Sequence, residues 1–260
     1  KNYDMKLLDE AEKVGVYLDQ QEKIEYSVSK NFDTYQVTLD GEKKIVKFTD
    51  ESEEPDALKK DLGELKEERS VEAYEFALGK VKEYVLQSRV IKKKQQIIDQ
   101  LNDLKVRNAD LNVADGLCRE GKLYINEALL KEMPKWAIRW CMCHELMHAL
   151  SDITTNGEKR YYASPFDETL TDLITASMFV DDIMHDSKCS KSCYYRYYQY
   201  TLGYISCFKE NAIYAYFYGY ENLFKLVDRD ELAFLVLTYD QLEESEFPHY
   251  RQFLLFSCQR

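Results

Sequence analysis

The segment HELMHALSD, residues 144–152, carries two histidines four positions apart, and Glu145 directly follows the first of them. If the segment is helical, His144 and His148 lie one turn apart on the same face, and both imidazoles can reach one ion. Glu145 lies about 100° around that helix from His144, so it can reach a water beside the ion but is poorly placed as a ligand. The pattern predicts a helix from about Pro134 to Ser151 that supplies two metal ligands and a general base.

A second helix is expected to begin at SPFD, residues 164–167, where a capping serine precedes a first-turn proline and an acid. Glu168 follows in its first turn, twenty residues after His148. Neutral imidazole and carboxylate are good ligands for zinc, and a catalytic zinc site takes three protein ligands and leaves the fourth position to water. We therefore expect one Zn²⁺ ion on His144, His148 and Glu168.

Asp172 is expected to hold one of the ligating imidazoles in place, because it lies one turn after Glu168 on the same helix face. Ligating histidines usually donate their other ring N–H to a carboxylate or a carbonyl. We assign Asp172 to the imidazole of His144. A surface acid or a capping partner is the alternative interpretation.

The two segments HELMHALSD, residues 144–152, and DETLTD, residues 167–172, together resemble the thermolysin-like gluzincin metallopeptidases, whose pattern is HExxH followed by ExxxD. The resemblance implies zinc-dependent hydrolysis of peptide bonds, with a peptide or protein as substrate and Glu145 as the base that takes a proton from water. We expect an α+β, zincin-like fold in two lobes. The N-terminal lobe would hold a small sheet, a backing helix and the HExxH helix, and the mainly helical C-terminal lobe would supply Glu168.

The family also has an edge strand before the active-site helix, which pairs with an extended substrate. The stretch Leu123-Tyr124-Ile125-Asn126 occupies the matching place in this chain and is expected to bind substrate. Backbone pairing would align a peptide without reading its side chains. An ordinary internal strand is the alternative for this stretch.

The family's downstream histidine or tyrosine, which stabilises the oxyanion, has no unique counterpart in this chain. The oxyanion donor is therefore unknown, and several residues are candidates for it. They are Tyr161, Tyr162, His185 and the tyrosines between Tyr194 and Tyr200.

The rest of the chain suggests three consecutive segments. Residues 1–55 form an N-terminal β-containing segment, because residues 24–48 are strand-like and Asp40-Gly41 is a hairpin turn signal between two strands. Residues 56–152 form the N-terminal zincin lobe, in which apolar residues between Ser70 and Leu104 recur at helical spacing and predict one long helix. Residues 153–260, dense in tyrosine and phenylalanine, are expected to form the helical C-terminal lobe.

Composition and net charge limit the classes of partner that the protein is expected to bind. The 260 residues carry a formal net charge of -12, which argues against nucleic acid, since binding to a phosphate backbone needs clustered Lys and Arg. No apolar run approaches the roughly 18 residues of a spanning helix, so no transmembrane segment is expected. The odd number of cysteines, 7, favours reduced thiols in a cytosol over a disulfide scaffold. Numbering begins at Lys1, so a signal peptide, a propeptide or an upstream domain could have been removed. The cellular compartment therefore stays undecided.

Other interpretations stay open beside these. The two histidines could be structural, held by hydrogen bonds. His185, Cys189 and Cys193 are spaced for a second metal, although partly buried structural residues fit them better. Cys141 and Cys143 could regulate zinc or pack as small apolar residues.

The protein could process one partner selectively, or it could be a zinc-containing regulatory or binding module without proteolysis. Cleavage specificity, endo- or exopeptidase action, calcium sites and oligomeric state are not readable.

Overall fold

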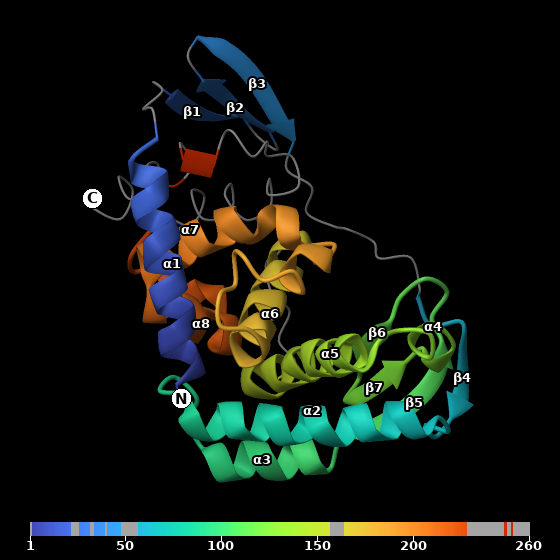
Figure 1. Ribbon diagram of the computed structural model, residues 1–260. Coiled ribbons are helices and arrows are strands. Elements are labelled where there is room, and N and C mark those ends of the chain that lie inside the picture. The colour runs from blue at the N-terminus through green and yellow to red at the C-terminus, as the bar shows by residue number, and fades with distance from the viewer. Residues whose placement is uncertain are drawn as a thin grey trace. The chain divides into compact units, whose positions relative to one another are not determined.

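Helices and two small sheets are found in the described residues, and the fold class is α+β as predicted (Figure 1). The computed structural model describes residues 2–21, 26–31, 34–39, 41–47, 57–156, 164–227, 247–248 and 251. Its contacts divide the chain into two units. One comprises Lys1–Asp4, Glu53–Glu158 and Ile174–Phe179, and the other comprises Met5–Ser52, Lys159–Leu173 and Val180–Arg260. The division into three consecutive segments stays a prediction.

The first unit is built on two packed helices, α2 (Glu68–Gln87) and α5 (Lys135–Thr155). α2 buries one stripe of residues that recur every three or four positions, which is the pattern of an amphipathic helix. α5 is buried on most of its surface and contains the HELMH segment, so the helix predicted over this segment is confirmed. It begins after Pro134 and ends at Asn156, whose left-handed conformation (φ 58°) terminates the helix.

The single long helix predicted between Ser70 and Leu104 is wrong. The chain forms α2 and a shorter α3 (Lys94–Asn102), separated by residues 88–93. Ser88 ends α2 in an extended conformation, and Lys93 is left-handed (φ 51°). The side chain of Ile91, which is buried, would lie about 240° from that of Val85 on a continuous helix. The break lets both side chains reach the core.

Four strands form a mixed sheet in the same unit, in the order β4-β5-β7-β6. β7 (Lys122–Ile125) is parallel to β5 and antiparallel to β6. Glu120 and Gly121 link β6 to β7 with positive φ angles of 51° and 72°, as a two-residue hairpin requires. The other strands are β4 (Lys60–Gly63), β5 (Lys105–Asp110) and β6 (Gly116–Arg119).

The buried carboxylate of Glu127, in the short helix α4 (Glu127–Leu130), caps the N-terminus of α2. It accepts hydrogen bonds from the backbone N–H groups of Lys66 (2.9 Å) and Glu67 (3.1 Å). Glu67, the N-cap residue of α2, makes no side-chain capping bond of its own. A distant acid therefore satisfies backbone donors at this end of the helix.

Replacing Glu127 with alanine should lower the free energy of unfolding by about 1–3 kcal/mol, because two backbone donors lose a charged acceptor. Chemical denaturation measures this as a lower midpoint at an unchanged m-value. The exposed neighbour Glu132 provides the matched control, and Glu132→Ala should leave the midpoint within experimental error. Equal midpoints for Glu127→Ala and Glu132→Ala would refute the capping role.

A helix that sequence patterns did not reveal, α1 (Tyr3–Asp19), belongs to the second unit from Met5 onward. It buries Leu7, Ala11, Val14 and Leu18, which share one helix face. A three-stranded antiparallel sheet follows in the order β1-β2-β3, with β1 (Tyr26–Asn31), β2 (Thr34–Leu39) and β3 (Glu42–Lys47). Leu39 pairs with Glu42 and Gly41 has a φ of 82°, which confirms the predicted hairpin between β2 and β3, and the structure adds one strand before it. Asp40 itself lies outside the described residues.

The described residues between 164 and 227 are mainly helical. The helices are α6 (Ser164–Phe179), whose residues from Ile174 belong to the first unit, α7 (Tyr198–Phe208) and α8 (Glu210–Tyr218). The short 3₁₀ turns η1 (Cys189–Lys191) and η2 (Tyr195–Tyr197) lie between α6 and α7, and η3 (Tyr220–Leu223) follows α8. The aromatic residues pack as core rather than around a cofactor. Phe166 of α6, for example, contacts the rings of Tyr204 and Tyr220.

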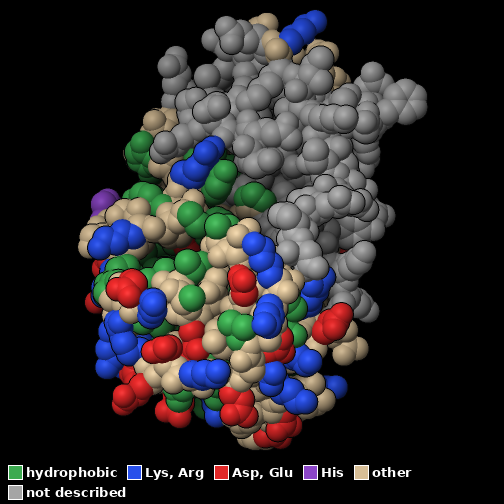
Figure 2. All heavy atoms as spheres, turned by 90° about the vertical axis from the view of Figure 1, so that its right-hand side faces the viewer, with side chains coloured by type: hydrophobic (Ala, Val, Ile, Leu, Met, Phe, Trp, Pro, Cys, Tyr) green, Lys and Arg blue, Asp and Glu red, His purple; other side chains and the backbone are tan. Residues whose placement is uncertain are grey.

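One face of the described residues carries both signs of charge. On the face that Figure 2 shows, Lys and Arg side chains lie among Asp and Glu side chains rather than in one basic area. The described helices include none with the length and apolar composition of a membrane-spanning segment.

Candidate metal centre

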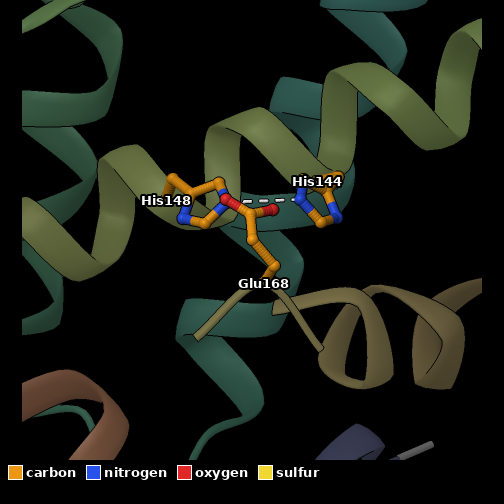
Figure 3. A group of neighbouring side chains, drawn as sticks. All are labelled: His144, His148 and Glu168. Carbon is orange, nitrogen blue, oxygen red and sulfur yellow. Dashed lines mark hydrogen bonds between the residues drawn. The ribbon is translucent and has the colours of Figure 1, made fainter. Parts of the chain in front are cut away.

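Three side chains that the sequence singled out come together in the structure. His144 and His148 project from α5, and the carboxylate of Glu168, near the start of α6, points toward them (Figure 3). The ligand atoms of the three residues all lie within 4.8 Å of one another. His144 is buried, and the other two are half-buried. The group could hold a metal ion, and it is the only such group found among the described residues.

The spacing of the two imidazoles fits zinc. Their Nε2 atoms lie 3.2 Å apart, and two nitrogens that bind one tetrahedral zinc at about 2.0–2.1 Å are separated by about 3.3 Å. The donors, two nitrogens and one oxygen, are those that catalytic zinc sites use, and three protein ligands leave a fourth position open.

The helix itself positions the two histidines. Residues i and i+4 lie on one face, and the neighbours of His144 and His148 on the other faces, such as Cys143 and Met147, are fully buried. The spacing of the two imidazoles therefore comes from the helix itself, and the buried faces of α5 fix the direction in which both imidazoles point.

Glu145 lies next to His144 on α5 and is half-buried. Its side chain packs against Gly116, the first residue of β6, where a Cβ atom would come within 2.5 Å of the Glu145 Cγ atom. The predicted general base is therefore on the helix that carries both histidines, and its carboxylate runs beside an outer strand of the mixed sheet.

Asp172 is a buried carboxylate one turn after Glu168 on α6. Its Oδ2 atom accepts a hydrogen bond from the Ser192 hydroxyl (2.6 Å) and another from the Tyr198 hydroxyl. Burial and the neighbouring Asp172 carboxylate raise the pKa of Tyr198 far above its usual range, so Tyr198 stays a donor. These bonds tie α6 to the segment before α7. The role of Asp172 in orienting His144 stays a prediction.

The strand predicted at residues 123–126 is confirmed as β7, but the prediction that it is an edge strand is wrong. β7 pairs with β5 on one side and with β6 on the other, so the alternative, an internal strand, is what the chain forms. Leu123, Tyr124 and Ile125 are buried, and Asn126 uses its side-chain amide to bind the Ala114 carbonyl (3.2 Å). A substrate peptide cannot add to this strand by backbone pairing.

The candidate oxyanion donors differ in whether the structure describes them and in the hydrogen bonds that they make. Tyr161 and Tyr162 lie outside the described residues. The hydroxyl of Tyr198 is engaged by Asp172, and that of Tyr195 donates to the Met184 carbonyl (2.7 Å). His185 is exposed and bonds to Asp182 through Nδ1 (2.9 Å). The bonds of Tyr195, Tyr198 and His185 therefore give none of these three a role as oxyanion donor.

The cysteines flanking the site differ in environment. Burial raises the pKa of the Cys143 thiol, which packs as a small apolar residue against the Ala77 carbonyl. The Cys141 thiol is half-buried and contacts the Asp115 carboxylate (3.9 Å). Burial also raises the pKa of Cys189, to about 12. His185, Cys189 and Cys193 do not form a metal-binding group in the described part of the chain.

Two residues near the site were missed by sequence reasoning, Asp115 and Gly116. Asp115 is half-buried, and burial raises its pKa although the Cys141 thiol and the charge of His144 act in the opposite direction. Neither residue belongs to a motif. The hairpin of β6 and β7 brings them to the site.

Comparisons of the chain with protein-family models, with curated proteins and with solved structures find no match.

Proposed function

We propose that this protein is a zinc-dependent peptidase that hydrolyses peptide bonds with Glu145 as general base. The observation that carries the proposal is the convergence of His144, His148 and Glu168 from two helices, with a carboxylate that is not one of the three beside them. The resemblance of these residues to the HExxH and ExxxD pattern supports the same activity. The donor set fits zinc, and the 3.2 Å separation of the imidazole nitrogens fits one ion.

Each residue has a distinct part in the proposed reaction. His144 and His148 offer neutral nitrogens and Glu168 offers a negatively charged oxygen, so the ligands neutralise half of the ion's charge. Zinc, when bound, supplies Lewis acidity that lowers the pKa of water and polarises a carbonyl group. Glu145 accepts a proton from the attacking water and, as a carboxylic acid, can pass it to the leaving amine.

A base in this position distinguishes the proposal from a purely structural metal site. A structural zinc site has four protein ligands and no need of a proton acceptor. The group described here offers three ligands, and Glu145 lies next to the first of them in the chain. These features favour catalysis over a regulatory or binding module. A broad peptidase and a selective processing protease would share the same chemistry and differ in substrate.

Metal analysis combined with a peptide library tests the proposal. The purified protein should bind one zinc ion per chain, and mass spectrometry should map cleavage sites in the library. Removing the metal with a chelator should abolish cleavage, and one equivalent of zinc should restore it. Many cleaved sequences would indicate a broad peptidase, and one or few would indicate a selective one. Bound zinc with no cleavage of any library peptide or protein would contradict the proposal and favour a binding module.

A further inference from the structure

The start of β6 leaves no room for a side chain at Gly116. A Cβ atom built there would lie 2.5 Å from Cγ, 2.7 Å from Cδ and 3.0 Å from Oε1 of Glu145. The backbone of Gly116 has no positive φ angle, in contrast to Gly121 at the end of the same hairpin. The backbone conformation therefore does not require glycine at position 116. What requires it is the space that the Glu145 side chain occupies.

The strand cannot easily retreat from Glu145. Gly116 pairs with Ile125 of the internal strand β7, and Ile125 is 1% exposed. The residues next to this pair are also bonded: Asn126, which follows Ile125, donates its backbone N–H to the Asp115 carbonyl (2.9 Å) and its side-chain amide to the Ala114 carbonyl (3.2 Å). These bonds hold the backbone just before Gly116 to a buried residue. An added methyl group would therefore displace the flexible end of Glu145 rather than the strand.

We propose that Gly116 is the positioning residue for the general base. Because it has no side chain, its backbone can contact the Glu145 side chain and hold the carboxylate in place. The inference rests on the proposed function, since it gives Glu145 a position that matters for proton transfer. A proton acceptor must lie within about 2.6–3.2 Å of the proton donor's heavy atom, and misplacement by about 1 Å can lower a rate 100-fold. In this proposal Gly116 acts through Glu145, whose atoms are the nearest to a Cβ built at position 116.

The test is Gly116→Ala in the zinc-loaded protein, with Gly79→Ala as the matched control. Gly79 lies in α2, and a Cβ atom there meets nothing within 4 Å. Gly116→Ala should bind one zinc ion and keep the wild-type melting temperature within a few degrees, while kcat falls about 100-fold and KM changes little. Gly79→Ala should retain wild-type kcat. Added to Glu145→Gln, Gly116→Ala should cause little further loss, because both act on the same base.

A crystal structure of zinc-loaded Gly116→Ala gives a readout that does not depend on activity. The proposal expects an unmoved metal centre and a Glu145 carboxylate rotated out of its wild-type position. Wild-type turnover with Glu145 in place would overturn it, and so would a loss of turnover that merely follows a loss of zinc. A wild-type protein that cleaves no peptide would instead refute the proposed function, and the position of Glu145 in the variant crystal would still decide the packing claim.

If Gly116→Ala fails to fold, the double variant with Glu145→Ala decides the matter. That second change removes the Cγ, Cδ and Oε1 atoms that the new methyl group would meet. The proposal then expects the double variant to fold. A double variant that also fails to fold would show that position 116 requires glycine for a reason other than Glu145, which would overturn the proposal.

Discussion

Glu145→Gln should abolish most peptide hydrolysis while the protein keeps one zinc ion per chain. Glutamine has nearly the shape of glutamate and leaves all three proposed ligands in place, but its amide cannot accept a proton from water. General acid–base catalysis typically contributes about 100-fold to 10,000-fold, so kcat should fall by that factor. The measurement pairs kcat on the best-cleaved library peptide with zinc content determined by elemental mass spectrometry.

Asp152→Asn is the control for this experiment. Asp152 lies on the same helix, two turns beyond Glu145, and the change again replaces a carboxylate with an amide. Asp152→Asn should keep kcat within a few-fold of wild type. A Glu145→Gln protein with full turnover would contradict the assignment of the base, whereas a variant that had lost zinc would point to a role in holding the metal.

Glu168→Ala should weaken zinc binding more than about 100-fold, beyond the roughly 10- to 100-fold that losing a hydrogen-bond partner of a ligand costs. The reason is that one of three protein ligands, and the one with a negative charge, is removed. Hydrolysis should fall in parallel with zinc occupancy and recover in part when zinc is added in excess. Titration with a competing zinc chelator measures the affinity directly.

Asp167→Ala removes the adjacent acid on α6 and is the control for charge. Because Asp167 is not in the group of candidate ligands, zinc affinity should change less than about 10-fold. Equal affinities in Glu168→Ala and wild type, with activity lost, would show that Glu168 serves hydrolysis without binding the metal.

Glu168 was predicted from its place after SPFD and from the resemblance to ExxxD, since its approach to the histidines depends on tertiary packing. The two histidines could be predicted because their geometry is local, one helical turn apart on the same helix. The hairpin at Asp40-Gly41 was predictable for the same reason, since the turn type depends on two residues. In each case, a short segment determines the feature.

Features that depend on distant contacts were missed or misassigned. Whether β7 is internal or outer depends on its pairing with β5, and the residues of 123–126 are compatible with both. The helix break before Lys94 is stabilised in part by the Ser88 hydroxyl, which donates to the buried carboxylate of Asp4 (2.9 Å). The need for glycine at position 116 arises only from contact with Glu145. None of these partners is a neighbour in the sequence.

Anomalous diffraction at the zinc absorption edge, from crystals of the zinc-loaded protein, tests the central claim most directly. The account predicts one strong peak at about 2.0–2.2 Å from an imidazole nitrogen of His144, an imidazole nitrogen of His148 and a carboxylate oxygen of Glu168. A zinc-loaded crystal without a peak between these side chains, or with the Glu168 carboxylate turned away from the ion, would contradict it.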